Sequence, residues 1–140
     1  MTTIVYNHKD KEIAFDSRTT SNGVIISNTK NKSLKVFGVT YMGSGDDDHI
    51  KALISVLSGQ SQGNDITSNQ AIVYWFIGGI AFKSGYNIDD GVWTQELESN
   101  EAIGSGFQWA LAAMDFGCNA KDAVKYAMTR DVYTGGKVRA

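Results

Sequence analysis

Short runs of β-branched and aromatic residues, separated by polar turns, fill most of the first hundred residues and limit this chain to a fold rich in β-sheet. Two of these runs flank the polar turn 9–11, which is the pattern of a β-hairpin. Two more lie on either side of the polar stretch 27–33, and three follow at about 70–77, 79–84 and 92–97. This pattern predicts antiparallel sheet.

Three segments have the periodicity of helices. Aspartates stand at the front of segment 46–58, where a helix favours negative charge, and apolar residues recur through it at helical spacing. Segment 105–117 is rich in alanine and apolar on most sides. Segment 120–130 follows Asn119, a good N-cap, with Asp122 three residues further on. With a short final strand in "VYTGGKVRA", the order of elements predicts an α+β fold with helices on the faces of antiparallel sheet.

Length and charge narrow the class of protein. The 140 residues predict a single domain over 1–140. A formal net charge of −2 disfavours nucleic acid and anionic membranes as partners. The apolar run 71–82 is too short to cross a bilayer. One cysteine, Cys118, excludes an internal disulfide and favours a reducing, cytoplasmic location.

No motif for a cofactor or metal ion has the spacing that its chemistry needs. His8 and His49 lie far apart, and neither has a second ligand at the spacing of a zinc site. The acidic run 46–48 is better explained as a helix front than as a cation site. The Gly-Ser-Gly segments 43–45 and 104–106 lack the Gly-Lys-Ser/Thr ending of a phosphate loop. We expect no cofactor and no metal.

Five motifs, each weak alone, stand in an informative order along nearly the whole chain. They are the Thr2–Thr3 start with "AFDSRTT" at 14–20, "NTKNKSLKV" at 28–36, "TYMGSGDDDHI" at 40–50, "AIGSG" before an alanine-rich segment, and "RDVYTGGKV" at 130–138. This order resembles the catalytic β subunits of the proteasome and their bacterial two-ring relatives, which are N-terminal nucleophile hydrolases. The chain is similar to a small bacterial or phage-type relative of them.

The resemblance implies a four-layer αββα sandwich, in which helices flank two antiparallel sheets. It also implies a trimmed version of that sandwich. The relatives have a second long helix where this chain has the loop 59–70, and they continue into a further strand beyond the position of Ala140.

The resemblance also assigns catalytic roles. Thr2, once freed of Met1, would be the nucleophile, Lys32 the nearby cation, and Asp16 the partner that keeps this lysine charged and oriented. A threonine hydroxyl is a poor nucleophile until a base takes its proton. A free α-amino group, with an ordinary pKa of about 7.7–8, supplies that base within the same residue. An adjacent lysine lowers the pKa of the site by its charge.

Further positions follow from the same resemblance. Three residues are expected near the amino group of Thr2: Ser105, Asp131 and Thr134. A backbone N–H at Gly43 would form the oxyanion hole, while Tyr41 and Gly45 would shape the substrate pocket. Taken singly, Asp16 is better explained as a turn residue and Lys32 as a solvated loop lysine, so only their joint presence supports the assignment.

The expected function is that of a proteasome-like threonine peptidase or amide hydrolase. The resemblance implies a homo-oligomer, with a ring as one form, peptide or unfolded-protein substrates, and an ATPase unfoldase as a partner. Two alternatives stay open. One is a non-catalytic structural or interaction subunit that keeps the fold within a larger assembly such as a virus particle. The other is a small amidase that acts on a metabolite.

Overall fold

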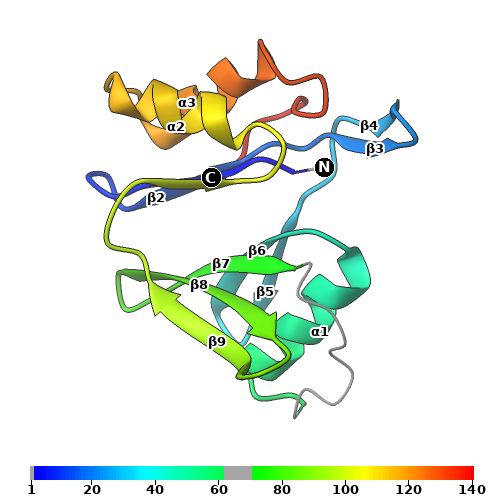
Figure 1. Ribbon diagram of the computed structural model, residues 1–140, viewed down its shortest axis with the longest axis vertical. Coiled ribbons are helices and arrows are strands. Elements are labelled where there is room, and N and C mark those ends of the chain that lie inside the picture. Colours follow the sequence, from blue (N-terminus) through cyan, green and yellow to red (C-terminus); the bar gives the residue numbers. More distant parts are fainter. Residues whose placement is uncertain (1, 62–70) are drawn as a thin grey trace. The chain divides into compact units, whose positions relative to one another are not determined.

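The computed structural model describes residues 2–61 and 71–140, which fall into two compact units. Unit 1 combines Met1–Lys32 with Glu98–Ala140, and unit 2 is Ser33–Leu97 (Figure 1). That residues 1–140 form a single domain stays a prediction. Most of the loop 59–70, where relatives were expected to have a helix, lies outside the described residues.

Unit 1 brings the two ends of the sequence into one antiparallel sheet. Strand β1 (Ile4–Asn7) lies between β2 (Glu12–Phe15) and β10 (Glu101–Ile103). The β1–β2 hairpin around residues 9–11 is confirmed, with Ile4 opposite Phe15. Strand β10 was not predicted. A separate two-stranded sheet pairs β3 (Thr19–Ser21) with β4 (Val24–Ser27).

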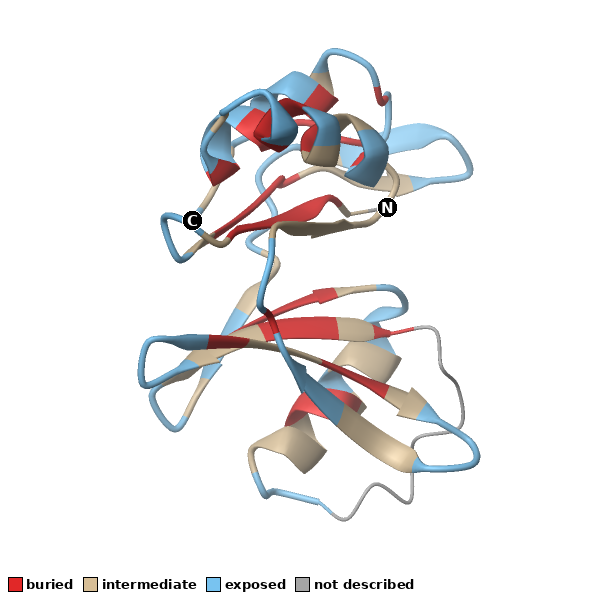
Figure 2. Ribbon diagram, turned by 60° about the vertical axis from the view of Figure 1, so that its left-hand side comes forward, coloured by how far each residue is buried: buried red, intermediate tan, exposed pale blue. Residues whose placement is uncertain are grey.

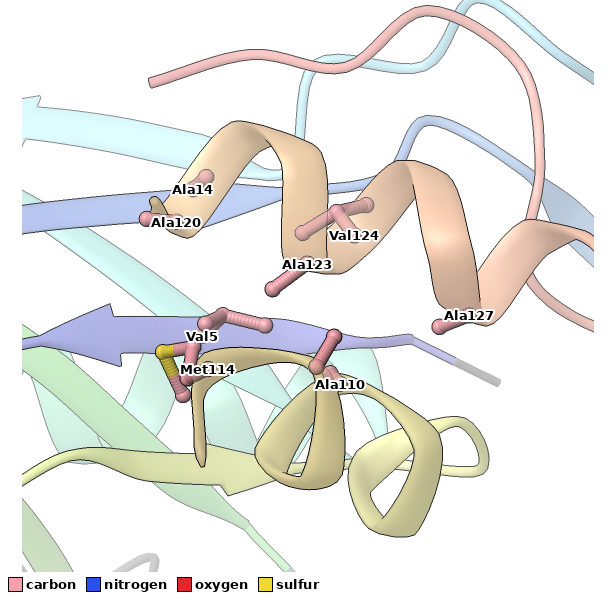
Figure 3. Close-up of a cluster of buried hydrophobic side chains, with 9 residues drawn as sticks. Val5, Ala14, Ala110, Met114, Ala120, Ala123, Val124 and Ala127 are labelled. Atoms are coloured by element: carbon pink, nitrogen blue, oxygen red, sulfur yellow. The ribbon is translucent and has the colours of Figure 1, made fainter. Parts of the chain in front are cut away.

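Two helices of unit 1 pack small side chains against β1 and β2. Helix α2 is Phe107–Asp115 and α3 is Ala120–Met128, close to the predicted segments. The predicted cap is confirmed, since the Asn119 side chain accepts a hydrogen bond of 2.8 Å from the N–H of Asp122. Alanines of both helices meet Val5 of β1 in the hydrophobic cluster of this unit, where the short side chains allow close packing (Figure 3).

Unit 2 is a five-stranded antiparallel sheet with one helix. Its strands run in chain order: β5 (Ser33–Val36), β6 (Val39–Ser44), β7 (Ile72–Ile77), β8 (Ile80–Asn87) and β9 (Gly91–Glu96). Helix α1 (Asp47–Leu57) begins behind Asp46, whose carboxylate caps it. Apolar residues of α1, such as Leu53 and Ile54, pack on the sheet as the buried core (Figure 2).

The segment 19–44 contains four strands where the sequence analysis predicted two. Two tight turns divide the expected runs, Asn22–Gly23 and Phe37–Gly38, and all four residues have positive φ angles between 50° and 81°. Two successive residues in this conformation form the turn that suits a two-residue hairpin. The predicted final strand is reduced to a single bridge between Phe15 and Arg139. In the described part of the chain, no helix is long and apolar enough to cross a membrane.

Candidate active site

The main chain at Thr2 passes close to a glycine of the loop before α2. Thr2 is half-buried and directly precedes the fully buried Thr3. Gly104 has a φ of +97°, and a Cβ atom there would lie 1.3 Å from the carbonyl oxygen of Thr2. Only glycine both adopts this conformation and leaves room for that carbonyl. Glycine at position 104 therefore leaves the room that the main chain of Thr2 occupies.

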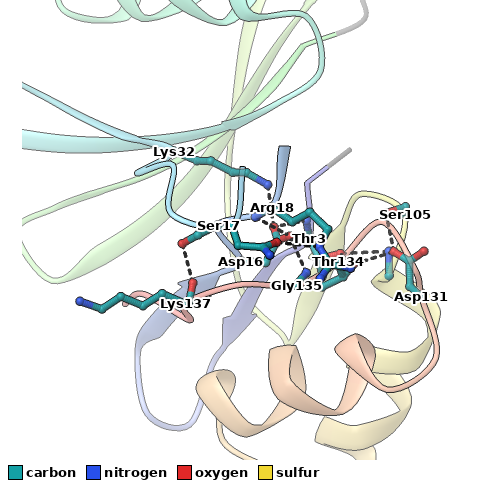
Figure 4. Close-up of polar contacts among 12 residues, drawn as sticks. Thr3, Asp16, Ser17, Arg18, Lys32, Ser105, Asp131, Thr134, Gly135 and Lys137 are labelled. Atoms are coloured by element: carbon teal, nitrogen blue, oxygen red, sulfur yellow. Dashed lines mark hydrogen bonds and ion pairs between the residues drawn. The ribbon is translucent and has the colours of Figure 1, made fainter. Parts of the chain in front are cut away.

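Asp16, at the end of β2, is the centre of a saturated carboxylate site. It is fully buried and accepts four hydrogen bonds. Its Oδ1 atom receives the Lys32 ammonium at 2.8 Å and the N–H of Thr3 at 3.1 Å. Its Oδ2 atom receives the N–H of Gly135 at 3.1 Å and that of Arg18 at 3.3 Å. We refer to Asp16 and Lys32 as the lysine–aspartate pair (Figure 4).

Lys32 is a buried cation, with 8% of its side chain exposed. Burial lowers the pKa of Lys32 below its usual value, because it removes water from the ammonium. The charge of Asp16 and its hydrogen bond act in the opposite direction and favour the charged form. The Lys32 ammonium therefore loses its proton more easily than the ammonium of a solvated lysine.

A second polar group joins the loop before α2 to the segment after α3. Ser105 Oγ donates to Oδ2 of Asp131 at 2.5 Å, and Thr134 Oγ1 donates to the same oxygen at 2.6 Å. Burial alone would raise the pKa of Asp131, but these hydroxyl bonds and one from the N–H of Tyr133 lower it below its usual value. We call Ser105, Asp131 and Thr134 the hydroxyl cluster. The hydrogen bonds of this cluster favour the ionised form of Asp131.

Thr3 links these two groups and was missed by the sequence analysis. Its N–H reaches Asp16, and its Oγ1 lies 2.6 Å from Oγ1 of Thr134. The repeated threonine at the start of the chain was the local signal at this position, and it assigns no role to the second threonine. The predicted residues Asp16, Lys32, Ser105, Asp131 and Thr134 are therefore brought together around Thr3 (Figure 4).

The "DSR" motif also fastens the C-terminal segment beside Asp16. The N–H of Ser17 donates to the carbonyl of Gly135 at 3.0 Å, and Arg18 donates to the carbonyl of Val132 at 2.8 Å. A Cβ atom at Gly135 would lie 2.4 Å from the guanidinium carbon of Arg18, so the glycine allows this contact. These bonds place the N–H of Gly135 against the carboxylate of Asp16.

The three residues predicted to contact substrate belong to unit 2. Tyr41 is buried on β6 with its ring centroid 5.9 Å from that of Trp75, and burial raises its pKa. Gly43 has a packing reason of its own, since a Cβ there would lie 2.4 Å from Ile50 of α1. Gly45 has a φ of +123°, which favours glycine. Their substrate roles stay predictions.

Comparisons with known proteins concern the fold. No protein-family model and no curated protein sequence matches the chain. BPH from Thiobacillus denitrificans, solved in complex with epoxomicin, is similar with a TM-score of 0.71 and 19% identity, over 99% of this chain and 96% of that chain. Eukaryotic HslV from Trypanosoma brucei gives 0.69 and 17%, over 98% and 96%. Another structure of the Thiobacillus BPH gives 0.67 and 20%, over 99% and 95%.

These similarities confirm the predicted fold class. The chain has the α+β, proteasome-like fold of the N-terminal nucleophile hydrolases, as its motif order suggested. At such identities the likeness establishes the fold and leaves the reaction to the site. Within residues 2–61 and 71–140, no group of three His, Cys, Asp or Glu side chains is arranged to hold a metal ion. The functional groups of the described site are hydroxyls, the separate carboxylates of Asp16 and Asp131, and the buried ammonium of Lys32.

Proposed function

We propose that this chain is a proteasome-like threonine peptidase or amide hydrolase, with Thr2 as N-terminal nucleophile once its bond to Met1 is cut. The observation that carries the proposal is the buried carboxylate of Asp16. The same oxygen of this carboxylate binds the Lys32 ammonium at 2.8 Å and the main chain beside Thr2 at 3.1 Å. A buried lysine cation costs free energy in a fold. Its presence next to a threonine is better explained by chemistry than by stability.

The proposed reaction uses the two functional groups of one residue. The free α-amino group of Thr2 takes the hydroxyl proton, and the charge of Lys32 stabilises the alkoxide as it forms. The oxygen then attacks the carbonyl carbon of the substrate amide. The tetrahedral oxyanion would be bound by the N–H of Gly43, with Tyr41 and Gly45 beside the substrate side chain. The protonated α-amino group of Thr2 then gives its proton to the leaving amine, and water hydrolyses the ester that remains on Thr2.

The hydroxyl cluster supports this scheme electrostatically. Asp131 is held as an anion by three donors, and its negative charge favours the protonated amine that forms during the attack. Ser105 and Thr134 would orient that amine. As partners we propose further copies of this chain in a homo-oligomer, a ring being one form, with peptide or unfolded-protein substrates and an ATPase unfoldase. The proposed location is the cytoplasm.

The decisive experiment compares variants of Thr2 in protein shown by intact mass to begin at Thr2. Wild type should cleave fluorogenic peptide amides and form a covalent adduct with epoxomicin, the compound bound in the Thiobacillus BPH structure. Thr2→Ala should do neither, and Thr2→Ser should retain part of the activity, because hydroxyl and amine remain. Thr19→Val is the matched control. The Oγ1 atom of Thr19 is buried without a hydrogen-bond partner among the described residues, so its loss should leave activity unchanged.

Lys32→Met tests the cation directly. Removing the charge should lower kcat by about 10²- to 10⁴-fold, as is typical for groups that stabilise charge in the reacting state. Removing one partner of a buried ion pair also destabilises a fold. Three backbone donors still bind the Asp16 carboxylate, and kcat is compared at a temperature at which both proteins are shown to be folded. Lys9→Met, on the exposed turn, is the control. If wild type and Thr2→Ala react alike, the non-catalytic structural alternative replaces this proposal.

A further inference from the structure

We infer that Thr3, the residue after the proposed nucleophile, is a positioning residue whose hydroxyl fixes Thr2 between the lysine–aspartate pair and the hydroxyl cluster. The inference rests on the proposed function, and it adds a residue to which the motif comparison assigned no role. Every polar group of Thr3 has a hydrogen bond, and its side chain is completely buried.

The backbone of Thr3 makes a double bridge to Asp16. Its N–H donates to Oδ1 of Asp16 at 3.1 Å, and its carbonyl accepts from the N–H of Asp16 at 3.2 Å. The same Oδ1 atom holds the Lys32 ammonium at 2.8 Å. A shift of Thr3 therefore displaces the peptide that leads to Thr2 and the acceptor of the lysine together.

The hydroxyl of Thr3 lies in a hydrogen-bond chain with a single direction. The N–H of Gly106 donates to Thr3 Oγ1 at 3.0 Å. Thr134 gives its only hydroxyl hydrogen to the carboxylate of Asp131 at 2.6 Å. The 2.6 Å contact between the Thr3 and Thr134 hydroxyls must therefore use the hydrogen of Thr3. Each step donates to the next, and the chain ends on an anion.

Close packing leaves the Thr3 side chain no second arrangement. A Cβ atom at Gly106 would lie 2.7 Å from Thr3 Oγ1 and 2.9 Å from Thr134 Oγ1, so the glycine is what lets the two hydroxyls meet. A β-branched side chain with one hydrogen bond given and one received is held in a single rotamer. Catalytic rates fall steeply when reacting groups move by an ångström or less. Loss of this anchor should therefore be seen in kcat.

The test is a set of isosteric and conservative variants, assayed with a peptide amide at least 10 °C below every midpoint of thermal unfolding. Thr3→Val keeps the shape and removes the hydroxyl. It should lower kcat by about 10- to 100-fold with KM changed less than about threefold. Thr3→Ser restores the hydroxyl and should recover kcat to within about threefold of wild type. The control, Thr19→Val, makes the same chemical change at an unpartnered hydroxyl and should leave both constants unchanged.

The outcomes separate this inference from the proposed function. If wild type is active, Thr2→Ala is inactive and Thr3→Val keeps its kcat, the inference on Thr3 is wrong and the proposed function stands. Equal losses in Thr3→Val and Thr3→Ser would also overturn it, since the hydroxyl would not be the cause. If wild type and Thr2→Ala are alike, both fail. Should Thr3→Val not fold, Thr134→Val breaks the same chain one bond further on and must show the same selective loss of kcat.

Discussion

The interiors of the two units differ in kind. In the described part of the chain, unit 1 buries several polar or charged side chains: Thr3, Asn7, Asp16, Ser17, Asp131 and Thr134. In unit 2 the corresponding residue is Ser84, within a core that is otherwise apolar. Each unit packs helical residues on antiparallel strands, so the two units differ in the polarity of the side chains that they bury.

This difference separates two ways of stabilising a small sheet. Unit 2 gains from removing apolar surface from water, which depends little on direction. Unit 1 must satisfy most of its buried polar groups, because an unpaired donor or acceptor costs about 1–3 kcal/mol. Its alanine-rich helices also bury a cluster of small apolar side chains around Val5. We expect unit 1 to be the more sensitive to polar substitutions, and the following predictions test that contrast.

The largest effect should come from Asp16→Ala. This change leaves the Lys32 ammonium and three backbone N–H groups in a buried site without their acceptor. Breaking a buried ion pair by removing one partner costs about 3–5 kcal/mol. Chemical denaturation should show a loss of that size together with loss of peptide hydrolysis. Asp10→Ala, at an exposed turn of the same unit, should change neither quantity, and a loss at Asp16 under about 1 kcal/mol would contradict the contrast.

Leu53→Ala probes the apolar interior of unit 2. Leu53 is 1% exposed and packs in the core formed by α1 and the sheet. Truncation of a buried leucine costs about 2–5 kcal/mol, depending on how far the cavity collapses. No charge is involved, so the loss should be equal at pH 5 and pH 8. A marked change of the loss with pH would show that this core also contains a titrating group.

The hydroxyl cluster should make the free energy of unfolding depend on pH in the acid range. The pKa of Asp131 is lowered in the fold below its ordinary value, so the unfolded chain binds the proton more tightly. Its stabilising contribution is complete above the unfolded value and is lost as pH falls through the lower, folded one. The free energy of unfolding of wild type should therefore exceed that of Asp131→Asn at neutral pH, and the difference should shrink below about pH 4. A constant difference down to pH 2 would contradict the assignment.

Elements marked by local signals could be predicted closely from the sequence. Helix α1 begins where the aspartates stand, and α3 begins at the predicted cap. Strand β10 could not be predicted, because it has only three residues and its partner, β1, lies at the other end of the sequence. The turn at Phe37–Gly38 was hidden by a phenylalanine with a φ of 50°, a conformation usually given to Asn or Gly. Asn22–Gly23 did carry the usual signal for such a turn.

The candidate site was predictable only as a set of motifs in order. Each of the residues Asp16, Lys32 and Asp131 has an ordinary alternative in isolation, and the sequence cannot show that their side chains meet. Thr3 was missed because its distinction from Thr2 is entirely tertiary. Its hydroxyl is hydrogen-bonded to Gly106 and Thr134, which are separated from it by 103 and 131 positions in the sequence. Long-range hydrogen bonds of this kind leave no periodicity in the sequence.

The smallest effect should come from Ser84→Ala, the polar exception in unit 2. Ser84 Oγ accepts from the indole N–H of Trp75 at 2.9 Å and lies 2.8 Å from the hydroxyl of Thr94. Trp75 is half-buried and Thr94 exposed, so water replaces part of what is lost, and we expect a cost of about 1 kcal/mol. Thr94→Val and the double variant complete a cycle, which should give a coupling of about 0.5 kcal/mol or more. Peptide hydrolysis should be unchanged throughout. If Ser84→Ala instead lowered kcat as Lys32→Met is expected to do, buried polar groups would matter for activity in both units, and the contrast between the units would fail.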